Sequence, residues 1–461
     1  MSHHYQYYVN GVFKESSTND YISIYSPYNE ALVGSVPALS VEEIDDMIAC
    51  AKSAQKAWAQ VPIRERASYL FAWADELLKS KHDIATTIMH EVGKGYNDAI
   101  KEVERTADLI RFTVEEALHM YGESLSGEHF PGGSSSKVAL VNRVPLGVIL
   151  AISPFNYPVN LSAAKIAPAL ITGNAVIFKP ATVGAISGIK MIEALHQTNL
   201  PPGVLNLVTG KGSVIGDYIT KHPGINMISF TGGTTTGQSI ASKAKMVPMV
   251  MELGGKDPAI VLDDANFELV AKEIVSGAFS YSGQRCTAIK RVLVDDNVAD
   301  VLIELIVKQM KQLKVGSPED NATIVPLIDT KSADYVQSLI DESLEKGAKL
   351  IVGNKRENNL LYPTLIDHVT VDMQLAWEEP FGPVLPIIRV HNVDEAIEIA
   401  NQSDYGLQAS VFTTNMTQAF EIARKLEAGS VQINGRTERG PDHFPFIGVK
   451  NSGVGVQGIK G

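Results

Sequence analysis

From residue 146 onward, short and continuous apolar segments alternate with helical ones, and this alternation constrains the fold more than any other feature. Strands buried on both faces of a sheet are apolar throughout, and their alternation with helices is typical of a parallel, doubly wound sheet. The apolar segments of the first block lie at 146–152, 175–178, 204–208, 227–230 and 249–252. The sequence therefore predicts an α/β protein with a Rossmann-like sheet, in which ligands bind outside the carboxyl ends of the strands.

A second alternating block extends from residue 258 to about 434. Its predicted strands lie at 259–262, 291–294, 349–352, 384–390, 409–412 and 430–433. A chain of 461 residues is too long for one hydrophobic core, so the two blocks are expected to form separate α/β domains. Before them, a hairpin is predicted at 5–13, turning at Asn10-Gly11, and helices are predicted at 63–78, 82–92 and 98–120.

Residues 123–142 interrupt the helical pattern, because they are rich in glycine, proline and serine and end in an alternation of apolar and polar residues. They form either a surface loop or a two-stranded arm that pairs with another subunit. Residues 447–461 are rich in glycine and contain no recognisable final element.

The charge and the cysteine content of the chain limit its possible partners and its location. A formal net charge of −12 argues against nucleic acid or an anionic membrane as partner, so an anionic substrate would need a local cluster of arginines. The two cysteines cannot form a disulfide framework, no signal peptide is visible, and no apolar run is long enough to span a membrane. We therefore expect a cytoplasmic protein, and one without a metal site, since no HExxH motif or Cys/His pair at ligand spacing occurs.

The segment at 281–287, which reads YSGQRCT, places Cys286 shortly after a predicted helix at 266–279. A thiol is a good nucleophile only as thiolate, and the permanently charged Arg285 beside it favours that form. The alternative is a small, buried, unreactive residue, which is the usual role of a free cysteine. The position of Cys286 alone leaves both readings open.

Polar side chains follow three of the predicted strands. Asn156 lies between two prolines and could donate its amide N–H to an oxyanion, or be a turn residue. Lys179 and Thr182, with no acidic residue soon after them, could face a 2′-phosphate, which favours NADP over NAD; otherwise they are an exposed lysine and a helix-entry threonine. Glu252 precedes two glycines and is a candidate general base, or the ion-pair partner of Lys256.

Three further segments could contact a nucleotide. The glycine-rich junctions at 210–216 and 231–237 could each offer backbone N–H groups to a pyrophosphate, although each is weak evidence alone. Glu379 lies in a rigid turn at 378–383, and its carboxylate could accept two sugar hydroxyls.

Together and in this order, these segments resemble the aldehyde dehydrogenase superfamily. The motifs are SPFNYP from 153, FKPAT from 178, FTGGTTTG from 230, ELGGK from 252, GQRC from 283 and EEPFGP from 378, and the resemblance covers nearly the whole chain. It is strongest to the NADP-dependent, non-phosphorylating glyceraldehyde-3-phosphate dehydrogenases, through additional segments at 104–106, 284–286 and 436–440.

The resemblance implies covalent catalysis with NADP as the cofactor. Cys286 would attack the aldehyde carbon, Asn156 would help to hold the oxyanion, and Glu252 would activate the water that hydrolyses the thioester. The implied cofactor site comprises Ser153, Pro154, Lys179, Thr182, Gly212, Thr231, Gly232, Leu253, Glu379 and Phe381. The implied substrate site, whose arginines could grip a phosphate, comprises Arg105, Tyr157, Arg285, Thr287 and Arg439.

The resemblance also implies an organisation and an assembly. An NADP-binding domain would comprise 1–122 and 143–251, a catalytic domain 252–440, and a small β oligomerisation arm and tail 123–142 and 441–461, in a homotetramer. Related chains usually continue past Gly461 into a strand that joins a neighbouring subunit, so the tail is expected to be truncated. Two alternatives stay open: a succinate-semialdehyde or other aldehyde dehydrogenase, and a non-catalytic protein of the crystallin type, against which Cys286 and Glu252 argue.

Overall fold

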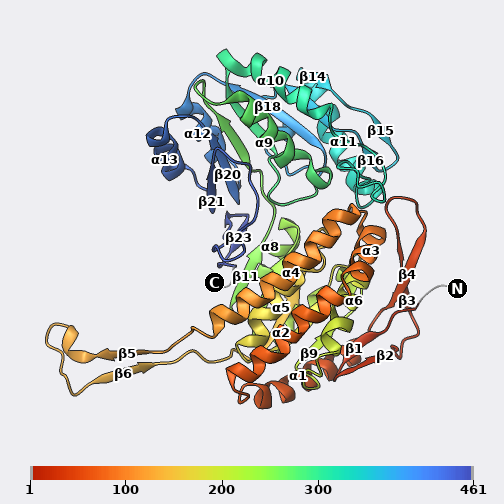
Figure 1. The fold of residues 1–461 in the computed structure, drawn as a ribbon, viewed down its shortest axis with the longest axis vertical. Helices are drawn as coiled ribbons and strands as arrows, with labels where there is room; N and C mark the ends of the chain where they lie inside the picture. Colours follow the sequence, from red (N-terminus) through yellow and green to blue (C-terminus); the bar gives the residue numbers. More distant parts are fainter. Residues whose placement is uncertain (1–3, 458–461) are drawn as a thin grey trace.

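The structure is a computed structural model and describes residues 4–457. Two α/β halves follow one another along the long axis of the molecule, and a thin β arm projects from one of them (Figure 1). The helices and strands of the first half come mainly from residues before 255, and those of the second half from residues after it. The parallel strands of each alternating block of the sequence thus lie together in one sheet.

The first half is built on an eight-stranded sheet with the order β2-β1-β9-β8-β7-β10-β11-β23. Its five central strands, β9 to β11 in that order, are parallel, as the apolar segments predicted. Both edges are antiparallel, since β1 pairs with β9 and β23 with β11. The strands are β1 (Tyr7–Val9), β2 (Val12–Lys14), β7 (Val148–Ile152), β8 (Ala175–Lys179), β9 (Leu205–Leu207), β10 (Met227–Thr231), β11 (Met249–Glu252) and β23 (Gly453–Val454).

Two groups of helices pack on this sheet. One group consists of α5 and α6, with α2 to α4 packed against them, and the other consists of α1, α7 and α8. The start of α1 carries the capping box between Ser40 and Glu43, which satisfies backbone donors at its first turn. The helices are α1 (Val41–Trp58), α2 (Ile63–Lys79), α3 (Lys81–Val92), α4 (Tyr96–Ala117), α5 (Asn160–Ile171), α6 (Ala185–His196), α7 (Gly212–Lys221) and α8 (Thr234–Lys243).

The second half contains a seven-stranded sheet with the order β14-β17-β18-β13-β12-β20-β21, parallel except for β14 at one edge. Its strands are β12 (Pro258–Val261), β13 (Arg291–Asp295), β14 (Lys349–Val352), β17 (Thr364–Asp367), β18 (Val384–Val390), β20 (Gln408–Phe412) and β21 (Ser430–Ile433). Its helices are α9 (Phe267–Phe279), α10 (Asp296–Met310), α11 (Thr330–Glu345), α12 (Val393–Asn401) and α13 (Met416–Lys425). Of these strands, β17 was not anticipated from the sequence.

Short elements complete the chain. Two-stranded sheets are formed by β3 (Tyr21–Tyr25) with β4 (Leu32–Pro37), β15 (Arg356–Glu357) with β16 (Leu360–Leu361), and β19 (Tyr405–Gly406) with β22 (Val449–Lys450). The 3₁₀ turns are η1 (Gly127–His129), η2 (Ser280–Gly283) and η3 (Gln374–Ala376).

The expectation that the tail has no final element is wrong, because β22 and β23 form in it. Each strand has only two residues, which is too short for a recognisable periodicity, and its pairing partner is distant in sequence. The tail thus returns the chain from the second half to the sheet of the first. Residues 458–461 lie outside the described part of the chain.

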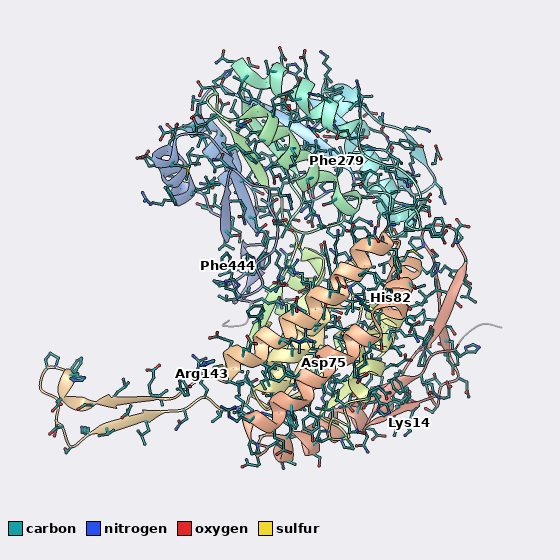
Figure 2. The ribbon with its side chains drawn as sticks, viewed as in Figure 1. Lys14, Asp75, His82, Arg143, Phe279 and Phe444 are labelled. Carbon is teal, nitrogen blue, oxygen red and sulfur yellow. The ribbon has the colours of Figure 1, made fainter. Side chains whose placement is uncertain are left out.

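Residues 123–142 form the two-stranded alternative rather than a surface loop. Strands β5 (Glu123–Ser126) and β6 (Val138–Val141) pair in antiparallel register and project away from the body, with Arg143 where the arm rejoins it (Figure 2). The arm exposes the apolar side chains of Leu125, Phe130 and Leu140. Separately, no helix among residues 4–457 is long and apolar enough to cross a membrane.

Candidate active site

The turn before Cys286 has an unusual backbone. After α9 ends at Phe279, Tyr281 and Ser282 both adopt positive φ angles, of 51° and 54°, which cost energy for residues with a side chain. Ser282 Oγ donates to the carbonyl of Val325 at 2.6 Å and accepts from its N–H at 2.7 Å. Neighbouring chain segments thus hold in place a strained turn, which is a common feature of functional sites.

Gly283 makes the turn sterically possible. Its own φ is 71°, and a Cβ at this position would lie 2.5 Å from the carbonyl oxygen of Gly382. Any larger residue would therefore push apart the two segments that carry Cys286 and Phe381. Glycine is therefore required here both by conformation and by close approach.

Asn156 lies beside this turn. It follows β7, is buried, and its Nδ2 donates to the carbonyl oxygen of Gln284 at 2.9 Å. The amide is therefore fixed within two residues of the cysteine, and both residues line one cavity.

The electrostatic surroundings of Cys286 differ from the prediction. Burial raises the pKa of its thiol to about 12, and the main charge that opposes this is Lys290 rather than Arg285. Lys290 Nζ donates to the backbone carbonyl of Cys286 and pairs with Glu379 Oε1 at 3.0 Å. The Arg285 guanidinium instead donates to the carbonyl of Gly277, in the last turn of α9, where backbone acceptors lack helical partners.

We expect Lys290→Met to slow alkylation of Cys286 by iodoacetamide in the free protein. Removing the cation raises the pKa of the thiol further, so the reactive thiolate fraction falls at every pH below it, by about tenfold for each unit of pKa. The measurement is the alkylation rate as a function of pH. Arg285→Met is the matched comparison and should have the smaller effect; an equal or larger effect would restore the original assignment to Arg285.

Glu252 ends β11, and donors surround its buried carboxylate. Thr231 Oγ1 donates to Oε2 at 2.9 Å, and Arg439 Nη1 lies 3.3 and 3.4 Å from the two oxygens. The side-chain amide of Gln457, in the orientation that satisfies both its oxygen and its nitrogen, also donates to both carboxylate oxygens of Glu252. Behind Thr231, Lys165 Nζ donates to the hydroxyl at 2.6 Å, and burial lowers the pKa of this lysine to about 8.

All ten residues predicted for the cofactor line one cavity of about 820 Å³ between the carboxyl ends of the first sheet and the turn that carries Cys286. This volume is within the range of sites for drug-sized ligands and cofactors. The starts of α7 and α8, at Gly212 and Gly233, lie in its wall and present unpaired backbone N–H groups. The cavity therefore fits a dinucleotide in both size and backbone chemistry.

Lys179 adds a charge that suits a phosphate. Its side chain is almost fully buried, and burial lowers its pKa to about 8. Its Nζ donates to the carbonyl of Pro180 at 3.2 Å, and no ion pair to it is formed within residues 4–457. A buried cation without a carboxylate partner, next to Thr182 in the wall of the cavity, favours a bound anion over an isolated lysine.

A second, smaller cavity of about 130 Å³ contains the five residues predicted for the substrate, together with Glu252. Cys286 and Leu161 line both cavities, so the thiol lies where they meet. Arg105 is bidentate to Asp442, at 2.7 and 2.8 Å, and Arg285 keeps its Nε without a partner in the described chain. The sequence-predicted nucleophile, base, cofactor residues and arginines are thus all brought together.

A sequence profile of the aldehyde dehydrogenase family matches residues 13–461. The chain belongs to the aldehyde dehydrogenase family. Over its full length it is similar to the NADP-dependent glyceraldehyde-3-phosphate dehydrogenase of Streptococcus equinus, with 55% identity over 460 residues and 96% of that protein covered. The corresponding enzyme of Pisum sativum is 48% identical, with 99% of this chain and 92% of the relative covered.

Solved structures agree with this assignment. The NADP complex of the NADP-dependent glyceraldehyde-3-phosphate dehydrogenase from Bacillus halodurans C-125 is 62% identical, with a TM-score of 0.98, and covers 100% of this chain and 96% of that one. The fold prediction, an α/β aldehyde dehydrogenase fold, is confirmed. Among residues 4–457, no group of three or more His, Cys, Asp or Glu side chains could hold a metal ion.

Sequence reasoning missed four side chains that shape the site of this aldehyde dehydrogenase: Lys165, Lys290, Asp442 and Gln457. Lys165 lies nine residues after Asn156 on α5, and Lys290 four residues after Cys286, so both could have been proposed from proximity. Asp442 and Gln457 belong to the tail, where no pattern signals a return to the first half.

Proposed function

We propose that this aldehyde dehydrogenase oxidises glyceraldehyde 3-phosphate to 3-phosphoglycerate with NADP and without inorganic phosphate. One observation carries the proposal: Cys286 lies between a cavity that fits a dinucleotide and a small cavity lined by three arginines. The printed names of the relatives above, which share 48% to 62% of their residues with the chain over nearly all of its length, support both the aldehyde and the cofactor.

The chemistry follows from the residues around the thiol. As thiolate, Cys286 Sγ would bond to the aldehyde carbon, and Asn156 Nδ2 with the Cys286 N–H would stabilise the oxyanion of the thiohemiacetal. NADP, when bound, supplies the acceptor for the hydride that leaves this carbon. Glu252 would then accept a proton from the water that attacks the thioester, which releases the acid and regenerates the thiol.

The lining of the two cavities supports roles for the remaining residues. Lys179 and Thr182 would hold the cofactor's 2′-phosphate, and Glu379 the hydroxyls of the nicotinamide ribose, with Phe381 beside the ring. In the small cavity, Arg105, Arg285 and Arg439 would bind the substrate phosphate, since guanidinium groups pair bidentately with phosphate oxygens. This basic corner explains how a chain with a formal net charge of −12 can bind an anion.

The test is the rise in NADPH absorbance when the purified protein meets glyceraldehyde 3-phosphate and NADP in a buffer free of phosphate. We expect turnover, with 3-phosphoglycerate as the product, and a kcat/KM well above that for succinate semialdehyde, which offers a carboxylate in place of the phosphate. No turnover by folded protein, or a preference for succinate semialdehyde, would overturn the substrate assignment.

Lys179→Met is the matched variant for the cofactor. We expect it to raise the KM for NADP at least tenfold, because the variant removes the cation that would bind the 2′-phosphate. The KM for NAD should change much less, because NAD has no 2′-phosphate. Equal effects on both cofactors would mean that Lys179 contacts a part that they share.

We also infer a homo-oligomer, with four subunits as in the implied assembly, in which the arm at 123–142 pairs with another subunit. The apolar side chains that the arm exposes support this. The division into an NADP-binding domain (1–122 and 143–251), a catalytic domain (252–440) and an arm with the tail is part of the same proposal. A cytoplasmic location is supported by two free cysteines, Cys50 and Cys286.

A further inference from the structure

Two of the three arginines proposed to hold the substrate phosphate, Arg105 and Arg439, are already paired with carboxylates of the protein. Arg105 is bidentate to Asp442, and Arg439 Nε lies 3.7 Å from the same carboxylate. Arg439 Nη1 pairs with Glu252, at 3.3 Å from Oε1 and 3.4 Å from Oε2. One guanidinium therefore contacts both the proposed phosphate site and the proposed general base.

The pair between Arg439 and Glu252 is enclosed. The Arg439 side chain is 13% exposed and that of Glu252 4% exposed, so water screens their attraction little. The guanidinium also lies over the ring of Phe446, with its carbon 5.1 Å from the ring centre. Thr231 and Gln457 also donate to the carboxylate, but they are neutral, so the ion pair with Arg439 is the contact that a competing anion could remove.

A phosphate in this small cavity would compete for Arg439. A phosphate ester carries up to two negative charges and three acceptor oxygens, whereas the Glu252 carboxylate carries one charge and two oxygens, which other donors also contact. The guanidinium can change partners by rotating its own side chain, while Thr231 and Gln457 continue to hold the carboxylate in place. These two neutral donors would then position Glu252 without an ion pair.

We propose that the substrate's phosphate draws Arg439 away from Glu252, so that a phosphorylated substrate frees the carboxylate that hydrolyses its own thioester. This deepens the proposed function and rests on it in taking Glu252 as the base and the arginines as the phosphate site. In the step concerned, the water oxygen bonds to the thioester carbon and a water proton passes to Glu252. The C–S bond breaks, its electron pair stays on Cys286 Sγ, and no redox change occurs.

Under this proposal, the enzyme discriminates between phosphorylated and unphosphorylated aldehydes partly at the step that hydrolyses the thioester. Glyceraldehyde, which lacks the phosphate, would still acylate Cys286 but would leave Glu252 paired with Arg439. Its thioester would accumulate, and the time course of NADPH would show a burst of about one equivalent per site followed by a slow steady state. A separate dianion in the small cavity would then relieve the pairing.

The experiment follows NADPH from wild-type protein, NADP and glyceraldehyde by rapid mixing, with and without sulfate. Sulfate is a tetrahedral dianion that cannot itself cleave the thioester. We expect sulfate to raise the steady-state rate at least threefold without changing the burst amplitude, and sodium chloride at the same ionic strength to have a much smaller effect. In Arg439→Leu, we expect the glyceraldehyde steady state to be faster than in the wild type and insensitive to sulfate.

Asp442→Asn is the matched comparison, because it removes the other carboxylate from the arginines but leaves the pair between Arg439 and Glu252. It should keep the burst and lower the sulfate concentration needed for half of the maximal stimulation. The proposal is overturned if wild-type glyceraldehyde turnover shows no burst, if sulfate acts no better than chloride, or if Arg439→Leu slows the steady state. The sulfate comparison uses the native sequence, so it tests the proposal even if a variant does not fold.

Failure of the proposed function has a different signature. If the wild-type protein does not oxidise glyceraldehyde 3-phosphate, the substrate assignment falls, and the coupling falls with it. If it oxidises this substrate rapidly and yet sulfate leaves glyceraldehyde hydrolysis unchanged, the function stands and only the coupling through Arg439 is wrong.

Discussion

Cys286→Ser is expected to abolish NADPH formation from glyceraldehyde 3-phosphate, with kcat lowered by roughly 10⁴-fold or more, as for other nucleophile replacements. The serine hydroxyl fits the same strained turn but is a far weaker nucleophile than a thiolate. The measurement is steady-state kinetics with NADP, together with thermal unfolding to show that the fold is kept.

Cys50→Ser is the matched control, because it makes the same atomic change at the other cysteine. Cys50 lies on α1, lines neither cavity, and its thiol has a pKa raised by burial. We expect its kinetics to stay within about twofold of the wild type. If Cys286→Ser kept substantial turnover, a covalent mechanism at this position would be excluded.

Glu252→Gln is expected to separate the two halves of the reaction. Acylation of Cys286 does not need the carboxylate, so one equivalent of NADPH per site should form in a burst. Hydrolysis loses its base, and the steady-state rate should then fall by roughly 10²- to 10⁴-fold, the usual contribution of general base catalysis. Rapid-mixing absorbance measures both phases in one trace.

The burst distinguishes this outcome from damage to the site. Loss of the burst together with the steady state would mean that Glu252 acts before the thioester forms, for instance on the thiol of Cys286. A steady state as fast as in the wild type would give the role of base to another residue, and Lys165, which reaches Glu252 through Thr231, would be the first candidate.

Most of the first sheet could be predicted because its strands are continuous apolar segments. The ends of β7, β8, β10 and β11 place Asn156, Lys179, Thr231 and Glu252 at one edge of the sheet, where parallel topology brings distant motifs together. The hairpin at Asn10-Gly11 could also be predicted from the sequence, since both residues have the positive φ that such a turn requires.

The charge network could not be predicted in the same way. Arg285 is next to Cys286 in sequence, but the strained turn sends its guanidinium back to α9, while Lys290 reaches the carbonyl of Cys286. Adjacency along the chain says little about the direction of a side chain when the two residues follow a strained turn. Asp442 joins the site through its bidentate contact with Arg105, 337 positions away, for which the sequence contains no signal.

The central claim is that catalysis passes through a thioester on Cys286 that Glu252 resolves. It is tested most directly by mixing Glu252→Gln with NADP and glyceraldehyde 3-phosphate, quenching in acid, and mapping the modified peptide by mass spectrometry. We predict a phosphoglyceryl group on Cys286, in an amount that matches the NADPH burst, and none on Cys50. NADPH formed in a burst without any adduct on Cys286 would contradict the account.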